Sequence, residues 1–205
     1  VFITGVNRGL GKHTFEKFLK EGSNIICTVR KRDIKFNDYL KKIKKKFNNK
    51  IKVLYFDFEN RSQIINSLGK LKKNLIIDLL INNVGFASGS ILEMTKIDDI
   101  EKIFKINYFS QLLIIQKLFS FLKKSKNASI INVTSISAFL DHRGTIAYGS
   151  SKSALSFATK IMANEFLAYK IRVNAIAPSA IETDMLTKMD KRSKNKLLKD
   201  TNLKK

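Results

Sequence analysis

The residues Val1-Phe2-Ile3-Thr4-Gly5-Val6-Asn7-Arg8-Gly9-Leu10-Gly11 open the chain with a short apolar run followed by three glycines. Residues 12–21 then carry Phe15, Phe18 and Leu19 at helical spacing before Gly22, which predicts an amphipathic helix that ends there. Glycines between a strand and a helix permit a tight turn and let the backbone approach a phosphate at the positive end of the helix. The stretch therefore predicts a strand, a phosphate-binding turn and a helix, with an ordinary strand-to-helix turn as the alternative.

The rest of the chain continues to alternate strands with helices. Apolar runs predict strands at residues 1–4, 24–29, 51–56, 75–81, 129–133 and 171–176, and helical stripes predict helices at 12–21, 37–47, 61–73, 98–124 and 147–169. Nearly continuous apolar strands that alternate with helices are typical of a parallel sheet covered on both faces. With right-handed crossovers, we expect an α/β fold, a doubly wound, Rossmann-type parallel sheet in three layers.

The length of the chain and the absence of a linker indicate one domain. The 205 residues suit a single domain, and we find no internal repeat or linker among them. The chain lacks an initial Met, opens inside a predicted strand and turns polar and basic after Pro178. We expect residues 1–205 to form one domain that belongs to a longer protein and lacks its last helix and strand.

Composition excludes several classes of protein. The single cysteine, Cys27, cannot form a disulfide within the chain and is expected to be buried and inert. No apolar run approaches the roughly 18–20 residues that span a bilayer. The N-terminus also lacks the basic and apolar regions of a secretory signal. With 44% hydrophobic residues the chain can build a core, so we expect a folded cytoplasmic protein without a membrane partner.

The net charge of +22 raises the question of a nucleic-acid partner. Only seven of the 39 basic residues are arginine, the residue that base readers and phosphate-binding sites favour. The lysines are scattered, and the joint abundance of Lys, Asn and Ile indicates a coding bias. We expect a solvated lysine surface and no nucleic-acid partner, with attraction to an acidic partner as the alternative.

The spacing Thr4-Gly5-x-x-x-Gly9-x-Gly11 resembles the glycine motif of the short-chain dehydrogenase/reductase family. Asn82-Asn83-Val84-Gly85 is similar to the family's Asn-Asn-Ala-Gly segment, which stabilises the central sheet and abuts the adenosine of a nicotinamide dinucleotide. Residues 174–183 are similar to a stretch whose backbone meets the nicotinamide carboxamide. The resemblance covers residues 1 to about 185 and implies these cofactor-binding residues: Gly5, Asn7, Arg8, Gly9, Leu10, Gly11, Arg30, Asp57, Phe58, Asn83, Val84, Gly85, Tyr148, Lys152, Pro178, Ile181 and Thr183.

Charge on the adenosine side indicates NADP(H) as the preferred cofactor, with NAD(H) as the alternative. NADP carries an extra phosphate on the adenosine ribose, whereas NAD-preferring relatives usually place an acidic residue after the second strand. Here Thr28-Val29-Arg30-Lys31-Arg32 has no acid before Asp33, and Arg8 adds a basic residue in the glycine turn. A guanidinium pairs strongly with phosphate. The generally basic composition is the competing explanation.

Tyr148 and Lys152 lie four residues apart, so a phenol and an ammonium share one face of a predicted helix. A neighbouring cation favours phenolate, and we expect Lys152 to lower the pKa of Tyr148 from its usual value of about 10. The pair alone is a weak signal. The resemblance adds Ser135, at the end of a predicted strand, and Asn107, an amide that interrupts an apolar stripe. A satisfied core asparagine is the alternative for Asn107, but the four residues together match the family's catalytic set: Asn107, Ser135, Tyr148 and Lys152.

The resemblance implies reduction of a carbonyl to an alcohol, or the reverse, by hydride transfer with nicotinamide. Tyr148 is implied to give the proton to the oxygen, and Ser135 to hydrogen-bond it. Lys152 is implied to bind the nicotinamide ribose, and Asn107 to complete a water-linked proton path. Residues 181–185 and the Arg8 turn look like those of 3-oxoacyl-acyl-carrier-protein reductases, whose acidic carrier would suit a basic surface. Sugars, steroids and other carbonyl compounds are the alternative substrates.

The sequence also leaves an alternative of another class, a non-catalytic dinucleotide sensor or nucleic-acid-binding protein on the same fold. The charge supports it, and the complete catalytic set opposes it. Ser179 stands where the family has glycine, and a positive φ there would carry a steric cost. Small residues would permit helices of two subunits to pair, so we expect a homodimer or homotetramer; these are Ala147, Ser151, Ala154 and Ala158.

Overall fold

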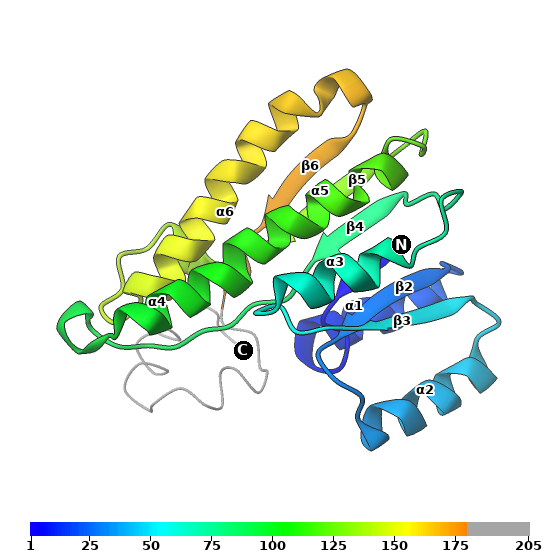
Figure 1. Cartoon of the computed structure of the whole chain (residues 1–205), viewed down its shortest axis with the longest axis horizontal. Helices are drawn as coiled ribbons and strands as arrows, with labels where there is room; N and C mark the ends of the chain where they lie inside the picture. Colours follow the sequence, from blue (N-terminus) through cyan, green and yellow to red (C-terminus); the bar gives the residue numbers. More distant parts are fainter. Residues whose placement is uncertain (180–205) are drawn as a thin grey trace.

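The structure is a computed structural model that describes residues 1–179, and these form a three-layer α/β arrangement around one parallel sheet (Figure 1). The strands lie in the order β3-β2-β1-β4-β5-β6, and every neighbouring pair is parallel. Their bounds are β1 (Phe2–Thr4), β2 (Ile25–Val29), β3 (Ile51–Tyr55), β4 (Leu79–Asn82), β5 (Ser129–Val133) and β6 (Arg172–Ile176). The order reverses beside β1, between its neighbours β2 and β4. This confirms the predicted doubly wound fold and places a ligand crevice at the carboxyl ends of the strands.

Helices cover the two faces of the sheet. Their bounds are α1 (Gly9–Lys20), α2 (Ile34–Lys46), α3 (Arg61–Gly69), α4 (Ile97–Phe104), α5 (Ser110–Leu122) and α6 (Ile146–Glu165), with short turns η1 (Leu92–Met94), η2 (Lys105–Phe109), η3 (Ile136–Ala138) and η4 (Leu167–Tyr169). Helices α1 and α2 contribute to one hydrophobic cluster, and α3, α5 and α6 contribute to the other. The strands therefore bury apolar side chains on both sides.

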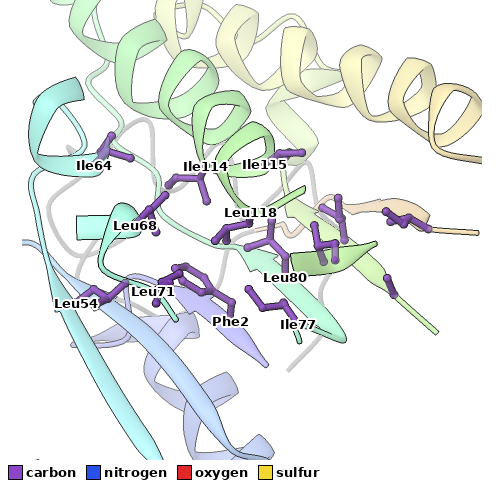
Figure 2. Packing of buried hydrophobic residues seen from close by; sticks show 14 of the residues in the cluster. Phe2, Leu54, Ile64, Leu68, Leu71, Ile77, Leu80, Ile114, Ile115 and Leu118 are labelled. Carbon is purple, nitrogen blue, oxygen red and sulfur yellow. The ribbon is translucent and has the colours of Figure 1, made fainter. Parts of the chain in front are cut away.

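Adjacent strand residues divide between these two clusters because successive side chains point to opposite faces of a sheet. Phe2 packs among the residues of α3 and α5, as Figure 2 shows, whereas Ile3 packs against α1. Phe15 of α1 is fully buried in the cluster formed with α1 and α2. Burying one such side chain stabilises the fold by roughly 1.5–3 kcal/mol. Many such side chains in the two clusters therefore hold the strands in place, including the ends at which the site lies.

Two predicted elements are shorter in the structure than the apolar pattern suggested. The helix predicted to reach residue 73 ends at Gly69, and the strand predicted at 75–81 begins only at Leu79. Leu79 pairs with Ser129 and Leu80 pairs with Phe2. The Ser129 amide donates to the Asp78 carbonyl oxygen at 2.8 Å, so the ladder between β4 and β5 begins at this point.

The long helix predicted at 98–124 is also interrupted. It comprises α4, a π-helical turn η2, and α5. A π turn places one more residue per turn than an α-helix and often marks a functional position. Asn107, a predicted site residue, lies inside it.

Candidate active site

The glycine turn forms an open helix N-terminus. Gly5 and Gly9 have φ of +71° and +53°, a region that other residues enter only at a steric cost. A Cβ on Gly11 would lie 2.1 Å from the Gly5 carbonyl oxygen, so α1 can approach the turn this closely only with glycine there. No side chain at the N-cap position bonds the amides of the first turn of α1. The turn is therefore a cradle that fits a phosphate group.

Asn83 fastens this turn to the segment after β4. Its Nδ2 donates to the carbonyl oxygens of Thr4 and Gly5, at 2.9 and 3.1 Å. In return the Thr4 hydroxyl oxygen accepts from the amides of Asn83 and Val84, at 2.8 and 3.1 Å. Val84, where the family has alanine, fits because Gly5 has no side chain: a Cβ on Gly5 would lie 2.6 Å from Val84 Cγ2. The Asn83 amide donates to the protein itself and so supports the cradle.

The predicted adenosine side lies at the ends of β2 and β3. Arg30 directly follows β2 and is exposed, and Arg32 lies with its guanidinium carbon 5.4 Å from the centre of the Tyr55 ring. Asp57 uses one carboxylate oxygen to accept from the Glu59 amide, at 2.9 Å. Phe58 differs from the others because its ring is buried in the core. The Phe58 carbonyl oxygen accepts from Ser110 Oγ at 2.5 Å, so neither the ring nor this carbonyl is available to a ligand.

Ser135 and Tyr148 meet at the carboxyl end of β5. Ser135 is the N-cap of η3 and accepts from the Ser137 amide at 3.2 Å, while Tyr148 lies in the first turn of α6. A Cβ on Gly149 would lie 2.8 Å from the Ser137 carbonyl oxygen, so glycine lets α6 pack against η3. Burial raises the pKa of Tyr148, and a hydrogen bond from Ser135 partly opposes the rise.

Lys152 is buried behind this pair, with 2% of its surface exposed. Its Nζ donates to the Val133 carbonyl oxygen at 2.8 Å and lies 5.9 Å from the centre of the Tyr148 ring. Burial lowers the pKa of Lys152 to about 8. We expected Lys152 to lower the pKa of Tyr148, yet the net direction for Tyr148 is upward, because burial of the phenol is the largest effect.

Asn107 reaches the same place from the π turn. Its Oδ1 accepts from the Phe86 amide at 2.8 Å, and its Nδ2 donates to the Phe86 carbonyl oxygen at 2.9 Å and to Ser151 Oγ at 3.0 Å. The buried amide is satisfied by protein groups, as the core alternative anticipated. Asn107 therefore ties the segment after β4 to α6, one residue from Lys152.

Residues 1–194 match the family model for the short chain dehydrogenases. The chain belongs to this family. It is 30% identical to the 3-oxoacyl-[acyl-carrier-protein] reductase FabG of Thermotoga maritima over 96% of this chain and 79% of that protein.

Two solved structures agree with the fold. The complex of Pseudomonas aeruginosa RhlG with NADP is 26% identical, with a TM-score of 0.80 over 94% of this chain and 77% of that chain. A 4-hydroxyisoleucine dehydrogenase complexed with NADH and succinate is 28% identical, with a TM-score of 0.80 over 91% and 79%. The chain is thus an oxidoreductase of the short-chain dehydrogenase family.

Several buried polar residues hold the site together through hydrogen bonds that the sequence analysis did not predict. Gln111 donates from Nε2 to the carbonyl oxygens of Val84 and Ile106, at 3.0 and 3.1 Å. Asn82 donates to Asn132, which donates to Thr159, both at 2.9 Å. Asn82 and Asn132 are register partners on β4 and β5. Amides inside two apolar strand segments were the available signal, because buried polar groups need partners.

The last predicted site residues along the chain are Pro178, Ile181 and Thr183. The Pro178 carbonyl oxygen accepts from the Ile136 amide at 3.1 Å, which holds Pro178 beside η3. Within residues 1–179, Lys170 alone among non-glycine residues has a positive φ, so the steric cost considered for Ser179 does not arise. Ile181 and Thr183 lie outside the described residues.

Across residues 1–179 there is no group of three or more metal-binding side chains. In the same range no helix has the length and apolar character needed to cross a membrane. Cys27 is buried, and burial raises the pKa of its thiol to about 12.

Proposed function

We propose that this protein is an NADP(H)-dependent oxidoreductase that reduces a carbonyl to an alcohol, or runs the reverse reaction, at Ser135, Tyr148, Lys152 and Asn107. The observation that carries the proposal is the placement of Lys152: it is buried, its Nζ lies 5.9 Å from the centre of the Tyr148 ring, and it donates to the Val133 carbonyl oxygen at the end of β5, two residues before Ser135. This end of the sheet adjoins the glycine cradle at β1, across the single strand β4. Residues 1–205 are proposed to form one domain.

The burial of each group suits a role in proton transfer. A bound nicotinamide would supply or accept the hydride. Tyr148, whose pKa is raised by burial, keeps its proton at neutral pH and can give it to a carbonyl oxygen as negative charge develops. Ser135 can donate a hydrogen bond to the same oxygen. Lys152, with a pKa of about 8, exchanges a proton readily near neutrality and could return one toward the site.

The cofactor preference rests on charge at the adenosine end. The residues that would hold the dinucleotide fit it: glycine occupies the close approach at Gly11, and the first turn of α1 is open to a pyrophosphate. Arg30 and Arg32 are exposed after β2, where the ribose phosphate of NADP would meet a cation. Similar proteins bind NADP in one case and NADH in another, so NAD(H) is the alternative cofactor.

The proposed substrate is a 3-oxoacyl thioester on an acyl carrier. The Thermotoga maritima relative carries that activity in its name. Several exposed apolar residues lie close in sequence to the candidate site residues. Phe86 follows Gly85, Phe139 and Leu140 follow Ser135, and Ile146 precedes Tyr148. These suit an acyl chain, and the excess of basic over acidic residues suits an acidic carrier.

A homo-oligomer is proposed on the apolar surface of α6 and the π turn. Phe157 and Ile161 lie one turn apart on α6 and are 65% and 44% exposed, and Phe109 of the π turn is 60% exposed. The small residues noted above contribute differently. Ala147 and Ser151 are buried within the chain, so neither is exposed to a second subunit, and Ser151 bonds Asn107 of the π turn.

The proposal is tested on the full-length protein by fluorescence titration with NADPH and NADH, followed by NADPH consumption with an acetoacetyl-carrier thioester and a panel of other carbonyls. The Tyr148→Phe variant should lose almost all turnover and keep its NADPH affinity, because only the transferable proton is removed. Tyr39→Phe is the matched control, since its hydroxyl bonds Glu16 on the far side of the sheet. Salt-dependent DNA binding without NADPH consumption on any carbonyl would favour the non-catalytic alternative instead.

A further inference from the structure

Ser179 has a buried hydroxyl that forms no hydrogen bond with the described part of the protein. Its Oγ is shielded from solvent and has no hydrogen-bond partner among residues 1–179. A buried polar group without a partner costs free energy. Where relatives carry glycine, this chain therefore bears a side chain that lacks a bond until a further group arrives.

The position of Ser179 restricts what that group can be. β6 ends beside β5, where the Thr134 amide and hydroxyl donate to the Ile176 carbonyl oxygen at 2.8 and 2.9 Å. The Ile136 amide then holds the Pro178 carbonyl oxygen at 3.1 Å. Ser179 is thus fixed next to η3, the turn that begins at Ser135.

The sheet order determines which half of a dinucleotide reaches this place. A dinucleotide lies across the carboxyl ends of the strands, with its pyrophosphate at the first turn. Its adenosine extends over β2 and β3, where the acidic or basic selectivity residue lies. The nicotinamide consequently extends over β4, β5 and β6, the side on which Ser179 lies. The carboxamide is the polar substituent of that ring, and it offers both an acceptor and donors.

We propose that the Ser179 hydroxyl is a positioning group that hydrogen-bonds the nicotinamide carboxamide, an inference that rests on the proposed function. A hydroxyl can donate to the amide oxygen or accept from the amide nitrogen. The bond would orient the ring beside Tyr148. The hydroxyl is unsatisfied without cofactor and satisfied with it, so its cost to the empty protein is recovered on binding.

The test compares two ligands on the full-length protein by isothermal titration calorimetry. NADPH contains the carboxamide, whereas 2′-phospho-ADP-ribose retains the adenosine half and lacks the nicotinamide. Ser179→Ala and Ser179→Gly should weaken NADPH binding about five- to ten-fold, the effect of one hydrogen bond. Neither variant should change the affinity for 2′-phospho-ADP-ribose. Thermal unfolding of the empty protein should show Ser179→Ala at least as stable as the wild type.

Ser153→Ala is the matched control, because its hydroxyl already donates to the Ala138 carbonyl oxygen at 2.6 Å. It should lower the unfolding temperature and leave the ratio of the two affinities unchanged. Equal weakening of both ligands by Ser179→Ala, or no weakening of NADPH, would overturn the role of Ser179 alone. A wild-type protein that binds neither NADPH nor NADH would overturn the proposed function and this inference with it.

Discussion

Burial dominates the chemistry of individual residues in this protein. Spacing along a helix predicted that Lys152 and Tyr148 would be close, and they are. It also suggested that the ammonium would acidify the phenol, but burial of each group has the larger effect. The same desolvation raises the pKa of Tyr148 and lowers that of Lys152, because it disfavours whichever form is charged. Both residues are thereby moved toward their neutral forms.

The depressed pKa of Lys152 predicts a pH-dependent cost to stability. Below pH 8 the lysine is charged in both folded and unfolded states, and burial opposes folding. Between about pH 8 and 10.5 the unfolded state binds more protons, so stability rises with pH in this window. Lys152→Met removes the buried charge and also the bond to Val133. We expect it to be more stable than wild type at pH 7 by about 2 kcal/mol, with the gain shrinking as pH rises through that window.

Urea unfolding at pH 7 and pH 9.5 measures this gain. Lys160→Met, at an exposed position on the same helix, should show no pH-dependent difference from wild type. A Lys152→Met variant that is destabilised by the same amount at both pH values would show that the buried ammonium carries no such penalty.

At the scale of elements, the π turn decides how Asn107 is used. In an uninterrupted α-helix, the apolar residues before and after residue 107 would lie on one continuous face. The structure instead widens the helix at residues 105–109, where Asn107 holds both backbone groups of Phe86. Gln111, just beyond the turn, holds Val84. The side-chain amides of Asn107 and Gln111 thus hold in place the segment from Asn83 to Phe86, which follows β4 beside the site.

Asn107→Ala should release this segment. It would remove three hydrogen bonds, two to the backbone of Phe86 and one to Ser151, and each contributes about 0.5–1.5 kcal/mol. We expect a loss of stability of about 2 kcal/mol in urea unfolding and faster hydrogen exchange of the Phe86 amide. Gln116→Ala, an exposed amide on the same helix, is the control. Unchanged exchange at Phe86 would contradict the anchoring role of Asn107.

At the scale of the whole molecule, the candidate site lies along one side of the sheet, where the carboxyl ends of the parallel strands meet. The carboxyl ends of six parallel strands bring together the glycine turn after β1, the asparagine segment after β4 and Ser135 after β5. Helix α6 then returns Tyr148 and Lys152 to that edge. Its outward surface carries exposed Phe157 and Ile161, which a monomer would leave in water.

Phe157→Asp should therefore weaken self-association. A charge placed in an apolar contact between subunits must be desolvated without a partner, so the oligomer should shift to smaller species in analytical ultracentrifugation. Ile34→Asp is the control, because Ile34 is an exposed apolar residue at the start of α2. The proposed interface would be wrong if both variants sedimented like the wild type or shifted equally.

Local patterns in the sequence determined the architecture and most of the candidate site of this protein. Apolar runs and helical stripes predicted the order of strands and helices, since both depend on neighbouring residues. Motif spacing likewise indicated Gly5, Gly11, Tyr148 and Lys152, and the family resemblance added Ser135. These features depend on short-range chemistry that one stretch of chain carries with it.

Tertiary structure alone decided the rest. The late start of β4 depends on where its ladder with β5 begins, and the buried ring of Phe58 depends on the packing of the helices above it. The direction of the Tyr148 pKa depends on how much water the assembled edge excludes. The π turn and the Asn82–Asn132–Thr159 chain likewise join residues that are distant in sequence. Burial and pairing at a distance are properties of the folded whole, so no local pattern could have specified them.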